Sequence, residues 1–207
     1  KKIEPLFYFA SPFLLKCSPA RRNRGLSPLT NRRNGPMTPY FHLIDTETPG
    51  RCDVTPLFAQ PAAFARLIAD LAQPFRATPL DYVAGIDALG FILGAALALH
   101  LRTGFIPIRK KGKLPGPAFQ AEFVDYSGQP KGLELRRGLL KTGERVLLVD
   151  EWIETGAQMQ AAVDLVERAG GQVAGLAAIN IDDSPVSARL RQRYPCHAIW
   201  HNMQPPA

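Results

Sequence analysis

A short apolar strand that runs directly into two carboxylates and a Thr-Gly turn is the feature that most constrains this sequence. The strand covers 146–149, the carboxylates are Asp150 and Glu151, and the turn spans 154–158. Because the four apolar residues do not alternate with polar ones, we expect this strand to be buried on both faces of a parallel sheet. The turn opens a helix expected at 156–169. This strand–turn–helix unit predicts an α/β fold.

Further helices and strands alternate along the chain. Pro61 is typical of the first turn of a helix, and apolar residues recur behind it at helical spacing. A helix that is apolar on most sides is expected at 89–101. Strands are expected at 82–86, 105–108, 145–149, 173–181 and 196–200, and two short ones within 119–135 around a loop at 127–132. This order predicts a mostly parallel sheet with ligands at the carboxyl ends of its strands.

The first 36 residues differ in composition from the rest. They are rich in Arg, Asn, Ser and Pro and contain one acidic residue, Glu4, so we expect a tail without packed structure at 1–36 and one domain at 37–207. The tail is either an organellar transit peptide or a non-native extension upstream of Met37. The apolar segment at 7–15 suits a secretory signal less well, because no small-residue cleavage site follows it.

The formal charge of +7 resides in this tail. Residues 37–207 contain 17 Lys and Arg and 17 Asp and Glu, so the predicted domain is neutral. A folded nucleic-acid-binding domain usually carries a basic excess on its surface, so we expect no nucleic-acid partner. No stretch reaches the roughly 20 apolar residues of a membrane span, so we expect no membrane partner.

The cysteines point to a reducing compartment. Cys17, Cys52 and Cys196 are too few and too scattered for a disulfide framework, and none has the CxxC spacing of a zinc site. We therefore expect a cytoplasmic location, or an organellar one if residues 1–36 are a true transit peptide.

The turn that follows the strand has the chemistry of a phosphate site. Consecutive backbone N–H groups and a helix N-terminus attract an anion, Thr155 adds a hydroxyl donor, and Gly156 lets the backbone approach closely. Asp150 and Glu151 would repel a phosphate, so they are better placed to accept hydrogen bonds from the hydroxyls of a sugar attached to it.

These features together resemble the phosphoribosyl pyrophosphate (PRPP) signature of type I phosphoribosyltransferases. Three further stretches are similar, in the same order, to adenine phosphoribosyltransferases: 53–56 (Asp-Val-Thr-Pro), 85–94 (Gly-Ile-Asp-Ala-Leu-Gly-Phe-Ile-Leu-Gly) and 109–116 (Arg-Lys-Lys-Gly-Lys-Leu-Pro-Gly). The resemblance covers residues 49–181.

The resemblance implies a fold and an activity. The fold is the type I phosphoribosyltransferase fold, a Rossmann-like parallel sheet flanked by helices, with a small hood formed by 38–58 and part of the C-terminal end. The activity is purine salvage, in which adenine and PRPP give AMP and pyrophosphate with Mg²⁺ held mainly by the PRPP. Members of this kind are usually homodimers.

The resemblance also implies which residues hold PRPP. The phosphate turn binds the 5′-phosphate through Glu154, Thr155, Gly156, Ala157 and Gln158. The ribose hydroxyls are bound by Asp150 and Glu151. The pyrophosphate lies against Asp87, Ala88 and Leu89, with Arg109 and Lys113 nearby.

Two acids are the candidate catalytic residues, and two further residues are candidates for base binding. Asp125 falls where the family has an acid on a loop that closes over the site, and it could manage the purine proton. Glu154 is the second candidate, because relatives acting on hypoxanthine have an acid at the matching place. Arg51 and Cys52 fall in the base-contacting stretch.

Three departures from the family pattern leave alternatives open. Asp-Ala-Leu-Gly at 87–90 replaces Asp-Ser-Arg-Gly, and Thr-Gly-Ala-Gln at 155–158 replaces Thr-Gly-Gly-Thr. The stretch at 50–53 is shortened. The alternatives are a phosphoribosyltransferase for another base and a non-catalytic regulatory protein that binds PRPP or a nucleotide.

Overall fold

A computed structural model describes residues 39–47, 52–125 and 128–201 of the chain. Two of the expectations, the basic tail at 1–36 and the base-contacting Arg51, fall outside these residues. The division into tail and domain therefore stays a prediction.

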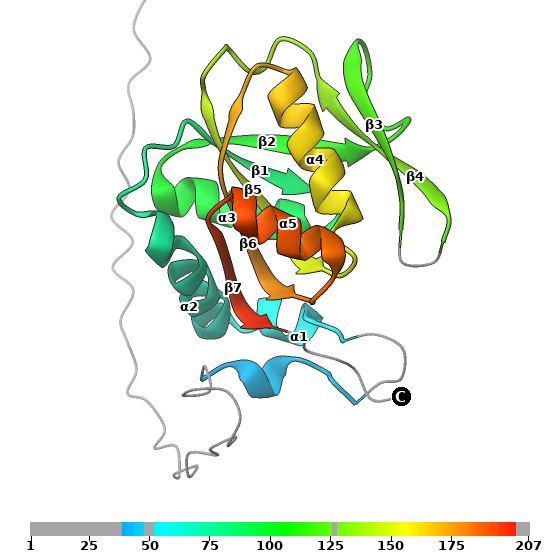
Figure 1. The fold of residues 1–207 in the computed structure, drawn as a ribbon. Helices are drawn as coiled ribbons and strands as arrows, with labels where there is room; N and C mark the ends of the chain where they lie inside the picture. Colours follow the sequence, from blue (N-terminus) through cyan, green and yellow to red (C-terminus); the bar gives the residue numbers. More distant parts are fainter. Residues whose placement is uncertain (1–38, 48–51, 126–127, 202–207) are drawn as a thin grey trace, which may run out of the picture. The chain divides into compact units, whose positions relative to one another are not determined.

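The described residues form a seven-stranded sheet in the order β3-β4-β2-β1-β5-β6-β7 (Figure 1). The five strands from β2 to β7 in this order pair in parallel, and the β3–β4 hairpin joins β2 in antiparallel fashion. The strands are β1 (Tyr82–Ile86), β2 (Gly104–Lys110), β3 (Ala118–Val124), β4 (Pro130–Arg136), β5 (Arg145–Ile153), β6 (Gln172–Ile181) and β7 (Cys196–His201).

Helices cover both faces of this sheet. α2 and α3 pack on one face, and α4 and α5 lie on the other (Figure 1). No helix of the described residues is long and apolar enough to cross a membrane. The α-helices are α1 (Thr55–Phe58), α2 (Pro61–Ala72), α3 (Leu89–Leu101), α4 (Ala157–Arg168) and α5 (Pro185–Arg193), and the two 3₁₀ turns are η1 (Phe41–Leu43) and η2 (Gln73–Phe75).

Strand β5 divides its side chains between two hydrophobic cores. Val146 and Leu148 pack with α4 and α5, while Leu147 and Val149 pack with α2 and α3. All four are fully buried, as expected for a strand covered on both faces. The prediction of an α/β sheet flanked by helices is confirmed.

The segment before α2 lies against the end of β7. The rings of Tyr40 and Phe41 make edge-on contacts with Trp200, at centroid distances of 5.9 and 5.4 Å. An isolated antiparallel bridge joins Asp45 to Asp53 within this segment. The described parts of 38–58 therefore meet the C-terminal end of the sheet, as expected for the hood.

Several elements differ from those predicted. β5 continues beyond Val149 through the acidic pair to Ile153, because its pairing with β6 persists to Ile181. β4 begins at Pro130, so the hairpin loop is shorter than the expected 127–132. α5 was not predicted at all, although Ser184 and Pro185 are typical of a helix start, and Ser184 forms a capping box with Ser187.

The strand order reverses between β1 and β5. The chain leaves β1 toward β2 on one side and leaves β5 toward β6 and β7 on the other. In open α/β sheets the crevice at such a switch point is where ligands bind. Asp87 follows β1 and Asp150 lies near the end of β5, so both carboxylates fall at this point.

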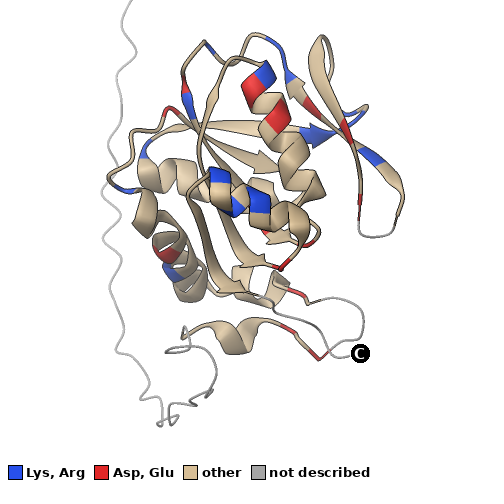
Figure 2. Ribbon diagram, viewed as in Figure 1, with Lys and Arg blue, Asp and Glu red and all other residues tan. Residues whose placement is uncertain are grey.

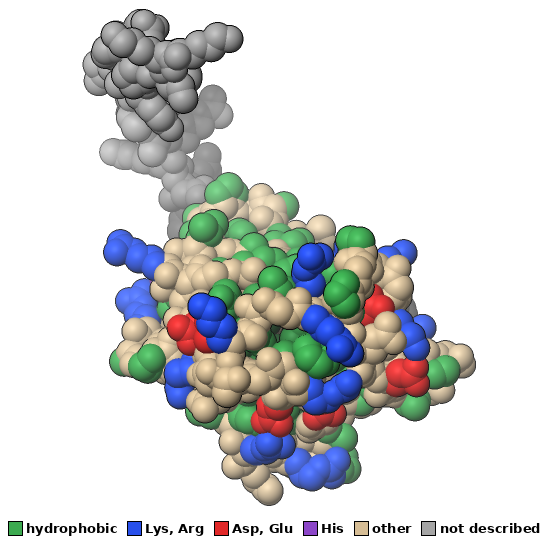
Figure 3. All heavy atoms as spheres, turned by 90° about the horizontal axis from the view of Figure 1, so that it is seen from above, with side chains coloured by type: hydrophobic (Ala, Val, Ile, Leu, Met, Phe, Trp, Pro, Cys, Tyr) green, Lys and Arg blue, Asp and Glu red, His purple; other side chains and the backbone are tan. Residues whose placement is uncertain are grey.

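Charges on the molecule are mixed. On the face seen in Figure 3, Lys and Arg side chains are interspersed with acidic and apolar side chains. The absence of a nucleic-acid partner stays a prediction.

Candidate functional site

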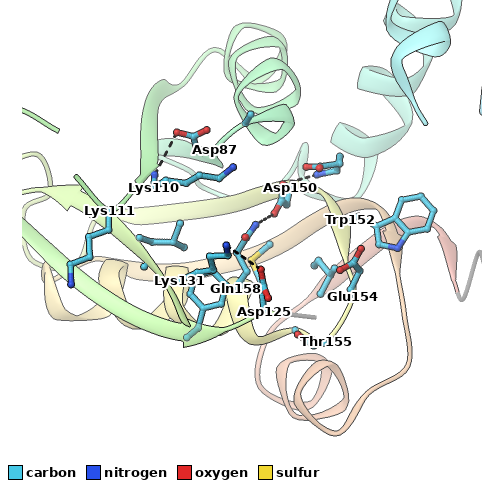
Figure 4. A pocket seen from close by; sticks show the side chains of 18 of the residues that line it. Asp87, Lys110, Lys111, Asp125, Lys131, Asp150, Trp152, Glu154, Thr155 and Gln158 are labelled. Atoms are coloured by element: carbon cyan, nitrogen blue, oxygen red, sulfur yellow. Dashed lines mark hydrogen bonds and ion pairs between the residues drawn. The ribbon is translucent and has the colours of Figure 1, made fainter. Parts of the chain in front are cut away.

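A cavity of about 810 Å³ opens at the switch point (Figure 4). It is bounded by the end of β1, the β3–β4 hairpin, the end of β5 and the start of α4. Ten of the predicted site residues line it: Asp87, Ala88, Leu89, Asp125, Asp150, Glu151, Glu154, Thr155, Gly156 and Gln158.

The buried acid of the pair, Asp150, is 3% exposed. Its Oδ1 accepts the backbone N–H of Glu151 at 2.9 Å, and its Oδ2 accepts the side-chain amide of Gln158 at 2.7 Å. Burial, and secondly the nearby charge of Glu151, raise the pKa of the Asp150 carboxyl well above its ordinary value. Each carboxylate oxygen has a second lone pair, so Asp150 can still accept a ligand hydroxyl.

Gln158 stands where the family pattern has a Thr, and its longer side chain makes a contact with the acidic pair. It reaches back from the first turn of α4 to Asp150 and fixes the orientation of that carboxylate (Figure 4). Sequence reasoning identified Gln158 as a departure in the phosphate turn but did not predict its bond to the acidic pair.

The phosphate turn is shaped by Gly156 and supported by α5. Gly156 has φ +78°, and a Cβ there would lie 2.9 Å from the backbone nitrogen of Ser187. The Ser184 hydroxyl donates to the carbonyl of Thr155 at 2.8 Å, and the Thr155 hydroxyl accepts the N–H of Ala157 at 3.3 Å. Ala157 itself begins α4 without lining the cavity. The first turn of a helix leaves backbone N–H groups without intrahelical partners, which suits an anion.

Asp87 is held at the opposite wall. Its N–H donates to the carbonyl of Ile108 at 3.0 Å, and the Asp87–Ala88 peptide bond is cis. The guanidinium of Arg109 lies 3.9 Å from the Asp87 carboxylate and donates to the carbonyl of Lys113 at 3.0 Å. Neither Arg109 nor Lys113 lines the cavity.

Three lysines that were not predicted as site residues line the cavity instead. Lys110 ends β2, Lys111 follows it, and Lys131 lies on β4. Lys111 pairs with Glu122 at 2.6 Å. Figure 2 shows the basic end of β2 beside the β3–β4 hairpin. The sequence at 109–113 predicts a basic segment near the site. Which of its side chains line the cavity depends on the register of β2 and could not be predicted.

A buried carboxylate holds the basic turn that follows β2. Glu134, 4% exposed, accepts the N–H of Leu114 at 3.1 Å and the side-chain amide of Gln120 at 3.0 Å. Backbone hydrogen bonds from Gly112 and then Leu114 lower the pKa of Glu134. This carboxylate therefore fixes the turn behind Lys110 and Lys111.

Asp125 lies just beyond the end of β3, on the hairpin wall. Its carboxylate is 3.9 Å from the Lys131 ammonium and accepts the N–H of Gln129 at 3.3 Å. The backbone of Asp125 is also paired with that of Gln129, which closes the described part of the hairpin. A carboxylate and an ammonium group thus line the cavity together from the two sides of the β3–β4 hairpin.

Cys52 does not line the cavity. It is 9% exposed and packs in the core shared by the hood, α2 and α3, where burial raises the pKa of its thiol. The Cys52 side chain packs in this core and does not line the cavity, and the base contact expected of it stays a prediction.

Comparison with known protein families shows to which family the chain belongs. Residues 54–197 match the phosphoribosyl transferase domain. This chain belongs to the phosphoribosyltransferase family. The matched range contains every residue that lines the cavity.

Individual relatives of this phosphoribosyltransferase are adenine phosphoribosyltransferases. The enzymes of Xanthomonas oryzae pv. oryzae (strain PXO99A) and Cereibacter sphaeroides (strain KD131 / KCTC 12085) are each 45% identical to it over 139 residues. The first alignment covers 66% of this chain and 74% of the relative, and the second covers 67% and 77%.

Solved structures of adenine phosphoribosyltransferases are similar to this chain in fold. The adenine phosphoribosyltransferase of Rhodothermus marinus DSM 4252 superposes with a TM-score of 0.71 at 35% identity, covering 77% of this chain and 94% of the other. The enzyme of Saccharomyces cerevisiae, complexed with adenine, gives 0.65 at 30% identity, covering 75% and 92%. The predicted type I phosphoribosyltransferase fold is confirmed.

The cavity of this phosphoribosyltransferase suits Mg²⁺ that arrives with a phosphorylated substrate. Hard carboxylate oxygens of Asp87, Asp150 and Glu151 face it from two walls. No group of three or more His, Cys, Asp or Glu side chains in the described part of the chain is arranged to hold a metal ion. Mg²⁺ commonly binds one or two protein carboxylates and completes its shell with phosphates and water, and these residues fit that mode.

Proposed function

We propose that this chain is a purine salvage enzyme that transfers the ribose 5-phosphate group of PRPP to N9 of adenine, giving AMP and pyrophosphate. The observation that carries the proposal is the cavity at the switch point. It combines a helix-opening turn, an adjacent acidic pair and three lysines in one space. The names of the 45% identical relatives favour adenine as the base.

In this proposal the 5′-phosphate binds the turn from Glu154 to Gln158. The backbone N–H groups and the positive end of the α4 dipole attract the phosphate. Asp150 and Glu151 accept hydrogen bonds from the ribose hydroxyls, Asp150 in the orientation set by Gln158. The sugar is thereby fixed with its C1′ toward the rest of the cavity.

The pyrophosphate lies between Asp87–Leu89 and the lysines. Lys110, Lys111 and Lys131 supply positive charge that offsets the charge of the departing group. Bound Mg²⁺, held by the PRPP oxygens with Asp87 or the acidic pair, neutralises part of the same charge. Arg109 contributes indirectly, by tying Asp87 to the turn at Lys113.

The reaction breaks the bond between C1′ and the pyrophosphate oxygen and forms the bond between C1′ and N9. Positive charge develops on the sugar, so water must be excluded, and closure of the β3–β4 hairpin would do this. The purine N9 proton must leave, and Asp125 on that hairpin is the proposed acceptor. Glu154, on the turn, is the second candidate for the same role.

Two further properties of the family are part of the proposal. We expect a homodimer in solution and a cytoplasmic location. The described cysteines, Cys52 and Cys196, are free thiols, as suits a reducing compartment. Light scattering of the purified chain tests the oligomeric state.

A second candidate function is binding of PRPP or a nucleotide without turnover. The observation that favours it is Leu89, an apolar residue that lines the cavity where the resembling enzymes have an Arg. A site without that cation stabilises departing pyrophosphate less well.

The experiment is a Mg²⁺-dependent assay of the full chain with PRPP and adenine, hypoxanthine or guanine, measuring nucleotide and pyrophosphate. We expect equal amounts of AMP and pyrophosphate from adenine. Product from another base would show that the chain catalyses the proposed reaction with a base other than adenine. If no base reacts but PRPP still raises the melting temperature, the chain binds PRPP without catalysis.

A further inference from the structure

Glu134 is a buried carboxylate that has no part in the proposed reaction. It lies on β4, is 4% exposed and does not line the cavity. In the strand pairing it is opposite Arg109 on β2 and opposite Gln120 on β3. A buried carboxylate is costly unless it is hydrogen-bonded, so the groups around Glu134 show what it holds.

The partners of Glu134 come mainly from the turn that follows β2. Its Oε2 accepts the N–H of Leu114 at 3.1 Å, and its Oε1 accepts the side-chain amide of Gln120 at 3.0 Å. Backbone hydrogen bonds from Gly112, Leu114 and Lys113 lower the pKa of the Glu134 carboxyl, so it is ionised at neutral pH. One carboxylate thus binds three successive backbone N–H groups and a side chain of β3.

The same turn carries two of the lysines that line the cavity. The N–H of Lys113 donates to the carbonyl of Lys110 at 3.2 Å, and Gly112 has φ +82°, so the chain reverses directly after β2. Lys110 and Lys111 begin this turn and line the cavity. Glu134 accepts the N–H groups that end the turn, so it holds the backbone that presents both lysines.

Lys111 also rests on β4. Its N–H donates to the carbonyl of Gly132 at 2.8 Å, and a Cβ on Gly132 would lie 3.0 Å from both Cβ and Cδ of Lys111. The Lys111 ammonium pairs with Glu122, whose side chain is 70% exposed. Because exposed ion pairs are weak, an anion in the cavity can compete for this ammonium group. The aliphatic part of the side chain is therefore held, while its charged end stays available.

We propose that Glu134 is the positioning residue of the pyrophosphate subsite, and that it holds Lys110 and Lys111 in place through the turn at 110–114. This rests on the proposed function, which places the pyrophosphate group beside these lysines. A turn that is not held in advance must become ordered when the anion binds, and that ordering lowers affinity. The ligand class is Mg²⁺-bound pyrophosphate, either free or as part of PRPP. AMP lacks this group and should not depend on Glu134.

Glu134→Met tests the positioning, because it keeps the length of the side chain, removes both acceptors and suits a buried place. We expect the Kd for Mg²⁺-pyrophosphate to rise about tenfold, the scale of ordering two long side chains, with the Kd for AMP within about twofold. Calorimetry measures both. Glu134→Gln keeps the shape and one acceptor oxygen and should give a smaller rise for pyrophosphate. If Glu134→Met does not fold, the same split in Glu134→Gln decides.

Glu144→Met is the matched control. Glu144 also holds a turn, since it accepts the N–H of Lys141 at 2.8 Å, but it precedes β5 and does not line the cavity. We expect this variant to bind pyrophosphate and AMP like the unmodified chain. Hydrogen exchange of the amides at 111–114 gives a readout without ligand, and it should be faster in Glu134→Met than in Glu144→Met.

The outcomes separate this inference from the proposed function. AMP formation by the unmodified chain, with an unchanged pyrophosphate affinity in Glu134→Met or with equal losses for pyrophosphate and AMP, would overturn the inference alone. Selective loss of pyrophosphate affinity in Glu134→Met, without turnover of any base by the unmodified chain, would support the inference and overturn the proposed reaction. An unmodified chain that binds no pyrophosphate would overturn the inference as well.

Discussion

The hydrogen bond from Gln158 to Asp150 joins the phosphate turn to the sugar-binding acid. A carboxylate that is almost fully buried has few ways to keep one orientation, and here the 2.7 Å bond supplies it. Burial and the Glu151 charge raise the pKa of Asp150 and make its ionised form costly, and the hydrogen bond from Gln158 opposes them in part.

Gln158→Met keeps the length of the side chain and removes its amide. We expect the Kd for PRPP to rise roughly tenfold or more, since a lost hydrogen bond to a charged group costs about 1.5–3 kcal/mol. Gln160→Met is the matched control, because Gln160 bonds to Asp164 on the same helix outside the cavity. Equal affinities for PRPP in both variants, measured by calorimetry, would remove the positioning role of Gln158.

Asp150→Asn tests the raised pKa of the buried carboxyl. A raised folded-state pKa means that the folded state binds the proton more tightly than the unfolded state, so stability falls as pH rises from the ordinary value through the raised one. Asn cannot ionise and avoids this loss. We expect similar melting temperatures near about pH 3, below the ordinary pKa of the carboxyl, and a variant that is more stable by about 2–4 °C near about pH 8. A constant difference between the two pH values would contradict the assignment.

At the scale of elements, the turns that form the site are held by hydrogen bonds to residues distant in the sequence. α5 caps the turn 154–158 through Ser184, and Glu134 on β4 fixes the basic turn after β2. Each of these contacts joins residues at least 20 positions apart in the chain.

Ser184→Ala removes both the cap of α5 and the bond to Thr155. We expect a loss of about 1 kcal/mol in the free energy of unfolding and a weaker affinity for PRPP. Ser184→Asp separates the two effects, because a carboxylate caps the helix but cannot donate to the Thr155 carbonyl. If Ser184→Asp restores PRPP affinity together with stability, the bond to Thr155 has no role in binding.

These contacts explain what the sequence could and could not predict about the site. The acidic pair and the Thr-Gly turn are local, and both were placed correctly in the cavity because a strand end and a helix start fix them. Lys131 could not be assigned, because its place depends on the pairing of β4 with β3. Arg109 was assigned from the family resemblance, yet its guanidinium lies toward Asp87 and the carbonyl of Lys113 and does not line the cavity.

At the scale of the whole molecule, the fold brings the two halves of the site together. β1 and β5 are adjacent in the sheet although about 60 residues of chain separate them, so Asp87 and Asp150 meet across one crevice. The alternation of strands and helices predicted a mostly parallel sheet with ligands at the carboxyl ends of its strands, but not the strand order that places β1 beside β5. It did not predict α5, whose polar sequence shows only weak apolar periodicity.

The most direct test of the account is calorimetric binding of PRPP in the presence of Mg²⁺ to the full chain and to Asp150→Asn/Glu151→Gln. Both substitutions keep the shape of the side chains and remove the charges proposed to hold the ribose hydroxyls. We expect saturable binding to the unmodified chain and a Kd raised by roughly tenfold or more in the double variant, with no loss of melting temperature. Equal binding by the two proteins would contradict a ribose 5-phosphate site at the switch point.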